Sequence, residues 1–294
     1  MTAPQTANSA ILPAATAPGR VGIRVADLDR SLGFYRDLMG FELIDRGRGQ
    51  ARLGAAASHQ PIIVLREVPG LARAPQSAAG LYHFAILLPS RPDLARFARH
   101  LIDSRLPFGQ SDHTVSEALY FDDPDGNGIE VYADRPRSTW PVDNGIVRMT
   151  GDPIDFEDLL GLLDDGQDRW SGMPDGTKIG HVHLRVSDLE RSKAFYVGTL
   201  GFDVTADFVR GALFVSAGGY HHHLGMNVWQ SRGRPLAGED VAGLDAYTIV
   251  LPDRESWEAV VRRLGGSPPD NGNFGAKDPD GISFHLVYDA DSTG

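Results

Sequence analysis

The chain has 294 residues, of which 41% are hydrophobic and 23% are charged, and its formal net charge is −11. This composition is typical of a globular protein, and the negative charge disfavours nucleic acid or an anionic membrane surface as a partner. Cysteine is absent, which excludes disulfides, thiolate metal ligands and a cysteine nucleophile and favours a cytoplasmic protein. No stretch reaches the roughly 18 uninterrupted apolar residues of a membrane span.

The first residues predict no structure. Residues 1–18 are rich in Ala, Pro and Thr and contain no Lys or Arg. A secretory signal would need a basic start and a longer apolar core. We therefore expect a disordered N-terminal tail over residues 1–18.

The remaining chain repeats itself. Three blocks of sequence match in the same order: 23–43 with 184–204, 80–101 with 243–264, and 122–134 with 277–289. The first pair reads IRVADLDRSLGFYRDLMGFEL and LRVSDLERSKAFYVGTLGFDV. Matched blocks in one order indicate an internal duplication.

Each half predicts a strand, a helix and further strands, twice over. GIRVADL at 22–28 alternates as a strand does, and Asp27 is placed to cap the helix that follows. YHFAILL at 82–88 opens a second unit, with a helix at 92–101 and the strand GIEVYAD at 128–134 after an Asp-Gly turn. The pattern predicts an α+β fold of four βαβββ modules in two duplicated domains.

These modules divide the chain into domains. We expect the first domain at 19–137 and the second at 178–290. The residues between them, 138–177, contain DPIDFEDLLGLLDDG. They predict a linker that carries one acidic helix.

The repeated motifs resemble those of the vicinal oxygen chelate superfamily, which includes glyoxalase I, bleomycin- and fosfomycin-resistance proteins and type I extradiol dioxygenases. The pattern VxDLxRSxxFYxxxxGF, followed by DPDGNxIE, extends over both halves. GLYHFAILLP at 80–89, the segment 116–140 and GGYHHHLGMNVW at 218–229 are similar to the bacterial catechol-2,3-dioxygenase-like branch. The resemblance implies cupped half-barrel sheets with metal ligands on their inner strands.

The resemblance also implies Fe(II), or Mn(II), held by two histidines and one carboxylate. Such a set leaves metal positions open for a catecholate and O₂. In the second half only His181 stands at a ligand position, because the other two positions hold Ala246 and His285. The second half alone therefore cannot build the site.

The first half supplies the missing residue types. His83 and Glu130 stand at the second histidine and carboxylate positions, whereas Arg20 stands at the first. We therefore predict one metal site from His83, Glu130 and His181, built by the second and third modules across the domain boundary. Such a site needs no dimer, and whether the protein is a homo-oligomer stays open.

Further residues match the extradiol pattern. Tyr120 stands where those enzymes carry an active-site tyrosine, and their acid–base histidine opens the strand read here as HLGMN. This predicts His223 as the acid–base residue; by strand alternation His221 shares its face and His222 points away. A polar strand edge is the alternative reading of this run. His113 is a weaker candidate for a hydrogen bond to the substrate.

The resemblance implies a metal-dependent extradiol dioxygenase, which opens the ring of a small catechol-type aromatic diol with O₂. Three alternatives stay open: a hydroquinone-type ring-cleaving dioxygenase, a glyoxalase-type isomerase, and a non-catalytic aromatic- or drug-binding resistance protein. The isomerase would normally add a second carboxylate, and the resistance proteins often lack the metal ligands. No nucleic-acid or membrane partner is expected.

Overall fold

The computed structural model describes residues 11–56, 60–164, 169–206 and 210–289. The helices are α1 (Leu28–Leu32), α2 (Arg91–Asp103), α3 (Phe156–Leu160), α4 (Leu189–Lys193) and α5 (Arg254–Arg263), with a 3-10 turn at Arg137–Thr139. Helices α1 and α4 continue as π-helical turns over Gly33–Leu38 and Ala194–Leu200. None of the helices in the described ranges has the length and apolar character of a membrane span.

The described strands form two sheets. The larger has ten strands, in the order β6 (Gly109–Asp112), β7 (Ser116–Asp122), β8 (Gly128–Asp134), β5 (Gly80–Leu87), β11 (Lys178–Arg185), β14 (Leu224–Asn227), β13 (Ala212–Ser216), β12 (Asp203–Ala206), β10 (Ile146–Val147) and β9 (Val142–Asp143). The smaller has seven, in the order β16 (Asn273–Lys277), β17 (Ser283–Tyr288), β15 (Gly243–Leu251), β1 (Ala17–Val25), β4 (Ile63–Glu67), β3 (Gln50–Gly54) and β2 (Glu42–Gly47).

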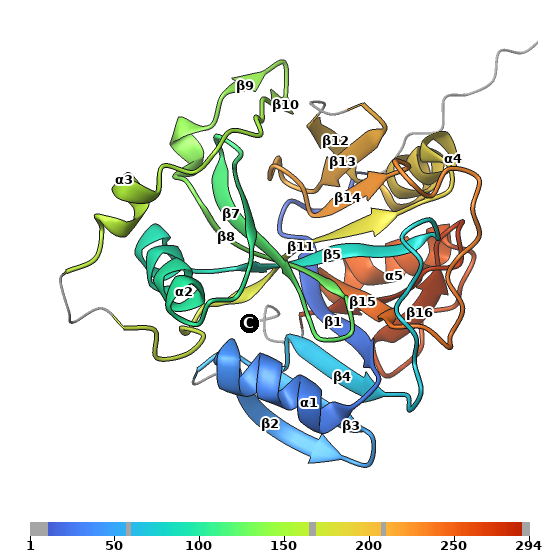
Figure 1. Cartoon of the computed structure of the whole chain (residues 1–294). Coiled ribbons are helices and arrows are strands. Elements are labelled where there is room, and N and C mark those ends of the chain that lie inside the picture. Colours follow the sequence, from blue (N-terminus) through green and yellow to red (C-terminus); the bar gives the residue numbers. More distant parts are fainter. Residues whose placement is uncertain (1–10, 57–59, 165–168, 207–209, 290–294) are drawn as a thin grey trace, which may run out of the picture.

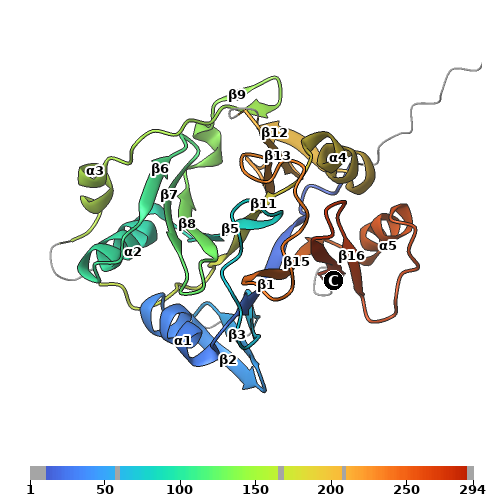
Figure 2. The same ribbon diagram turned by 45° about the vertical axis from the view of Figure 1, so that its right-hand side comes forward.

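Each sheet combines one module from each half of the chain. The larger sheet joins the second module to the third through the antiparallel pair β5 and β11. The smaller sheet joins the first module to the fourth through the antiparallel pair β1 and β15. The sheets curl, and α1, α2, α4 and α5 lie on their outer sides (Figures 1 and 2). The predicted α+β fold of duplicated modules in cupped sheets is confirmed.

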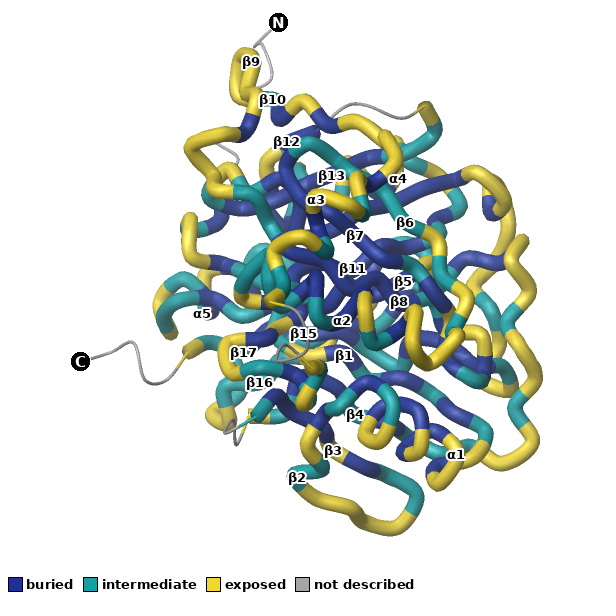
Figure 3. The backbone as a smooth tube through the Cα atoms, turned by 60° about the vertical axis from the view of Figure 1, so that its left-hand side comes forward, coloured by how far each residue is buried: buried dark blue, intermediate teal, exposed yellow. Residues whose placement is uncertain are grey.

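The repeated motif residues account for the repeated local structure. The side chain of Asp27 accepts a hydrogen bond from the backbone N–H of Arg30 and so caps α1 as predicted. Asp188 caps α4 in the same way. On β1, Val21 and Ile23 are buried and the residues between and beside them are less so, as the alternation predicts. Figure 3 shows that the buried residues concentrate along the central strands.

The DPDG turns are anchored by the tyrosine of the other repeated motif. The Tyr35 hydroxyl donates to the carboxylate of Asp123 at 2.9 Å, and the Tyr196 hydroxyl donates to that of Asp278 at 3.0 Å. In both turns the same carboxylate also accepts backbone N–H groups two and four residues ahead. Two distant motifs therefore stabilise each other in each half.

The predicted N-terminal tail is partly wrong. Residues 1–10 lie outside the described residues, but Leu12 is only 3% exposed and its backbone N–H donates to the carbonyl of Gly201 at 2.9 Å. Strand β1 already begins at Ala17. The tail prediction therefore fails for residues 11–18. A single apolar side chain, that of Leu12, gives no periodic signal in the sequence but is buried in the hydrophobic core.

Candidate metal centre and substrate cavity

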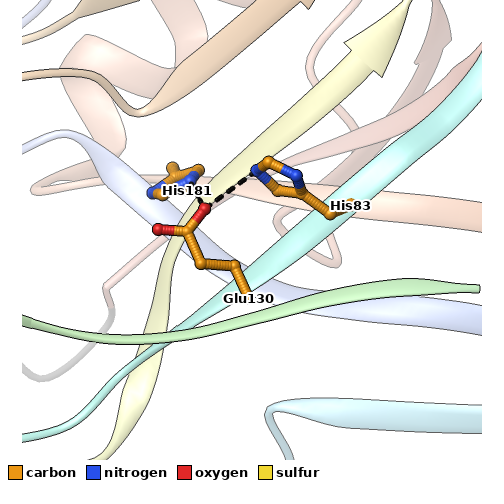
Figure 4. A group of neighbouring side chains, drawn as sticks. All are labelled: His83, Glu130 and His181. Atoms are coloured by element: carbon orange, nitrogen blue, oxygen red, sulfur yellow. Dashed lines mark hydrogen bonds and ion pairs between the residues drawn. The ribbon is translucent and has the colours of Figure 1, made fainter. Parts of the chain in front are cut away.

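Three side chains converge at the centre of the larger sheet. His83 projects from β5, Glu130 from the neighbouring β8 and His181 from the neighbouring β11 (Figure 4). One potential ligand atom from each lies within 4.8 Å of the others. The Nε2 atoms of both histidines lie 3.0 Å from the same carboxylate oxygen, Oε2 of Glu130. The structure thus brings together the residues predicted as metal ligands.

Burial sets the charge of this group. His181 is 1% exposed, and burial lowers its pKa to about 4 in spite of the carboxylate beside it. Burial alone would raise the pKa of Glu130, but the interactions with His181 and His83 together outweigh burial and hold that pKa well below its ordinary value. At neutral pH the pair is therefore a neutral imidazole and a carboxylate, which are the protonation states that bind a metal.

Two buried nitrogens at the centre are unsatisfied. Among the described residues, His83 Nε2 and His181 Nδ1 are buried with no hydrogen-bond partner, and the approach of His83 Nε2 to Glu130 lacks hydrogen-bond geometry. An unsatisfied buried polar group costs about 1–3 kcal/mol. A divalent cation bound by all three side chains would satisfy His83 Nε2. Two imidazoles and one carboxylate form the donor set of non-haem Fe(II) sites with open positions, and the residues present fit such an ion.

A cavity of about 1020 Å³ opens onto the group. His83 and Glu130 line it, whereas His181 lies behind them. Its aromatic lining residues are Tyr82, Phe108, Tyr120, Phe121, Phe214 and Trp229. This volume is at the upper end of the range for small-molecule sites, and the aromatic lining suits a flat apolar ring.

Two predicted residues are hydrogen-bonded to each other in the lining of this cavity. Tyr120 pairs with Glu130 between β7 and β8, and its hydroxyl lies 2.8 Å from His113 Nε2. His113 Nδ1 lies 2.7 Å from the carbonyl of Thr150 and so donates to it. Neutral His113 then accepts at Nε2 from the Tyr120 hydroxyl. Burial, and then the charge of Glu130, raise the pKa of Tyr120 well above its ordinary value and keep it protonated.

The histidine run is oriented differently from the prediction. His222 lines the cavity, and its ring centroid lies 4.1 Å from that of His181, whereas His221 and His223 do not line it. His223 Nδ1 instead accepts the backbone N–H of Ala217 at 3.2 Å, and its ring stacks on Tyr220. The prediction failed because β14 begins only at Leu224, so the alternation of a strand does not apply to the three histidines.

His221 links His222 to a carboxylate that the sequence analysis missed. Asp134 Oδ1 lies 3.1 Å from His221 Nε2, and His221 Nδ1 lies 2.8 Å from His222 Nδ1. Because a carboxylate only accepts, His221 donates from Nε2 to Asp134, and in its neutral form it accepts at Nδ1 from His222. With both rings neutral, the unprotonated nitrogen of His222 is Nε2. No local motif marks Asp134, which ends β8 far from the histidines in sequence.

The equivalent positions of the smaller sheet hold no such group. His285 Nδ1 lies 2.8 Å from the amide oxygen of Asn273 on the neighbouring strand, and Arg20 is exposed. In the part of the chain that the structure describes, no second cluster of three His, Cys, Asp or Glu side chains has metal-site spacing.

Comparison with known proteins gives matches along most of the chain. The family model of the Glyoxalase/Bleomycin resistance protein/Dioxygenase superfamily matches residues 17–131 and 178–286. A catechol-2,3-dioxygenase of Bacillus subtilis (strain 168) is 46% identical over 269 residues, which cover 89% of this chain and 93% of that protein.

Solved structures share the fold at low identity. The cppA protein of Streptococcus pneumoniae TIGR4 is similar with a TM-score of 0.55 at 11% identity, covering 96% of this chain and 99% of that chain. Glyoxalase I of Zea mays is similar with a TM-score of 0.53 at 19% identity, covering 93% and 92%. Identities this low show a common fold alone.

Proposed function

The chain belongs to the glyoxalase/bleomycin resistance protein/dioxygenase superfamily and is a dioxygenase of the extradiol type, and we propose that it opens the ring of a catechol with O₂. We place the metal on His83, Glu130 and His181. The observation that carries this proposal is the convergence of the three buried side chains beside a cavity lined with aromatic residues.

The donor set supports Fe(II), and Mn(II) accepts the same ligands. These three residues would hold the ion, whose charge would lower the pKa of a diol hydroxyl and which would supply the chemistry with O₂. The protein leaves room for both, because it contributes only three ligands and opens the cavity directly beside them.

We assign the acid–base role to His222 in place of His223. Burial, and then the neighbouring His181, lower the pKa of His222 well below its ordinary value, so the ring is neutral at pH 7. Its hydrogen bond to His221 leaves Nε2 unprotonated. His222 can therefore take a proton from the diol at Nε2 and return it after the ring opens, while Asp134 and His221 hold the tautomer.

Tyr120 and His113 act on the opposite side of the cavity. The Tyr120 hydroxyl is protonated and held by His113, so it can turn its hydrogen bond toward a substrate oxygen on which negative charge develops. The aromatic side chains around the cavity exclude water from this charge and present faces and edges on which a ring can stack.

The alternatives predict different results in one experiment. The purified protein is loaded anaerobically with Fe(II), Mn(II) or Zn(II), mixed with catechol, hydroquinone or a glutathione hemithioacetal, and exposed to air. We expect O₂ uptake and a yellow ring-opened semialdehyde with catechol and Fe(II) or Mn(II), and none with Zn(II). Isomerisation of the hemithioacetal, O₂ uptake with hydroquinone alone, or tight binding of catechol without uptake would each reject the proposal.

A further inference from the structure

We propose that Arg185 gives the cavity a subsite for an anionic group, so that the preferred substrates are aromatic diols with a carboxylate substituent. The diol part of this statement rests on the proposed function, whereas the anion subsite rests on the geometry of Arg185 alone.

Arg185 lies on the strand that supplies a ligand of the metal centre. It ends β11, and the unbroken register of β11 with β14 pairs Arg185 with Asn227. Alternation places it on the same face as His181 and His183, and Arg185 and His183 both line the cavity. Arg185 also borders a smaller cavity of about 130 Å³ between the two sheets' modules.

The space beside Arg185 is open. Gly80 lies directly opposite it on β5, where side chains of a cross-strand pair point to the same face. A Cβ atom added at Gly80 would have no heavy atom within 4 Å. A ligand group can therefore approach the guanidinium from this side without displacing the protein.

Arg185 is a half-buried cation without a counterion. Its Nε is buried without a hydrogen-bond partner, and no hydrogen bond or ion pair reaches its guanidinium from the described residues. Four other half-buried arginines are satisfied: Arg24 donates to the carbonyls of Val241 and Leu244, Arg66 to Asp245, Arg91 to Glu117 and Asp158, and Arg135 to Asp112. A buried charge is costly unless it is paired. A carboxylate that takes two parallel N–H bonds is the partner that a guanidinium fits best.

The cavity lining carries a second guanidinium. Burial lowers the pKa of Arg185, and Tyr82 and Asp122 oppose this effect from beyond ion-pair distance. Arg73, which is exposed, also lines the cavity. The lining holds two carboxylates as well, Asp122 and Glu130, and Glu130 lies with the histidines of the metal centre. No ion pair from the described residues reaches the Arg185 guanidinium, so an anionic group of a ligand can pair with it.

The distance along the strands suits a substituted diol. Arg185 is two residues from His183 on β11, and His183 pairs with His83 on the neighbouring strand β5. Two residues span about 7 Å along a strand. A ring held by its two oxygens at the metal centre therefore directs a substituent on its far side toward Arg185.

The test compares carboxylated diols with their neutral methyl esters. The metal-loaded protein is titrated anaerobically, by calorimetry, with 3,4-dihydroxybenzoate and 3,4-dihydroxyphenylacetate and with the ester of each. Because a hydrogen bond to a charged group contributes about 1.5–3 kcal/mol, we expect the acid to bind about 10- to 100-fold more tightly than its ester. Arg185→Met removes this preference, and Arg185→Lys retains part of it.

Substitutions of three arginines show which residue is responsible for the preference for the acid over the ester. Arg46→Met makes the same change of charge at an exposed residue that pairs with Asp29 and does not line the cavity, and it leaves the acid-to-ester ratio unchanged. If Arg73→Met removes the preference and Arg185→Met does not, the assignment is wrong. If Arg185→Met does not fold, as judged by its thermal unfolding, Arg185→Gln replaces it in the same titrations.

Measurements of binding and of turnover distinguish failure of the anion subsite from failure of the proposed function. A wild-type protein that binds acid and ester equally, yet cleaves catechols, overturns the anion subsite and leaves the proposed function standing. A protein that prefers the acid through Arg185, yet consumes no O₂ with any diol, supports the subsite and rejects the proposed function.

Discussion

The larger and smaller sheets are built from modules of the same type, paired in the same way, but only the larger holds the three candidate ligands. In the larger sheet Ala85 pairs with Glu130, and in the smaller sheet the equivalent pair is Thr248 with His285. His83 corresponds to Ala246, and His181 corresponds to Arg20. The frame that carries a buried group of potential ligands in one sheet therefore carries none in the other.

This difference separates structural from functional residues. The capping aspartates and the tyrosine–aspartate anchors of the DPDG turns occur in both halves, and in both they make the same local contacts. The residues of the metal centre occur at only one of two equivalent places. In a duplicated fold, residues that occur in both halves build the common structure. Residues that occur in only one half are the stronger indicator of a functional site.

The largest expected effect comes from removing one ligand. His83→Ala, Glu130→Ala and His181→Ala should each reduce bound metal from about one ion per chain to near zero, because two remaining ligands bind weakly. His285→Ala, at the matching position of the smaller sheet, is the control and should keep its metal. Metal content after anaerobic reconstitution and desalting measures this, and full retention in the three ligand variants would refute the assigned site.

The next effect distinguishes the neighbouring histidines. His222→Gln should lower kcat by about 10²- to 10⁴-fold, the usual contribution of a positioned acid–base group, with metal content unchanged. His223→Gln should change kcat far less, because His223 bonds to its own turn outside the cavity. Steady-state O₂ uptake measures both. A larger loss for His223 than for His222 would restore the prediction made from strand alternation.

A smaller effect depends on pH and distinguishes the two DPDG turns. Burial raises the pKa of Asp278 from 3.8 to about 6. The folded state thus favours the protonated carboxyl of Asp278. The contribution of this group to the free energy of unfolding is fully present below about pH 4 and is lost as the pH rises through about 6. In the wild type the free energy of unfolding should fall by about 3 kcal/mol over this range, and Asp278→Asn should abolish this pH-dependent fall.

Asp123 is the matched control for this titration. Its carboxylate also accepts from the side chain of Asn127 at 2.9 Å, where the other turn has Ile282. Asp123→Asn should therefore change the pH dependence of unfolding less than Asp278→Asn. Equal effects in chemical denaturation at pH 4 and pH 7 would show that the two turns are electrostatically equivalent.

The smallest effect tests the shared anchor. Tyr35→Phe and Tyr196→Phe each remove one hydrogen bond to a buried carboxylate and should lower the free energy of unfolding by about 1.5 kcal/mol, the lower end for a bond to a charged group. Both variants should bind metal normally, because neither tyrosine lines the cavity. The thermal midpoint and metal content together check this. Loss of metal in Tyr35→Phe alone would mean that the frame and the centre are coupled.

Sequence reasoning reached the frame and the ligand set for different reasons. The modules were predictable because the motifs repeat in order. The three candidate ligands were predictable because the residue types missing from one half stand at the matching positions of the other, so that His83, Glu130 and His181 complete a single set.

The remaining site residues depend on tertiary structure. His222 was misplaced because the start of β14 decides its orientation, and a period of two says nothing about residues before the strand. Asp134 belongs to the site only through His221, which is distant in sequence. The significance of Arg185 is the absence of a partner, which no sequence pattern records. Leu12 was assigned to a tail because a single apolar residue has no period.

The pairing of β1 with β15 and of β5 with β11 has a consequence for how the chain acquires its structure. Each contact joins residues from opposite halves, so closing either sheet brings together strands that lie far apart in the chain, at a cost in chain entropy. Such non-local contacts form slowly. During synthesis the first half emerges with the edges of β1 and β5 still unpaired, and they stay open until β11 and then β15 follow. The metal centre therefore assembles late, and acquisition of the ion reports that the two halves have joined.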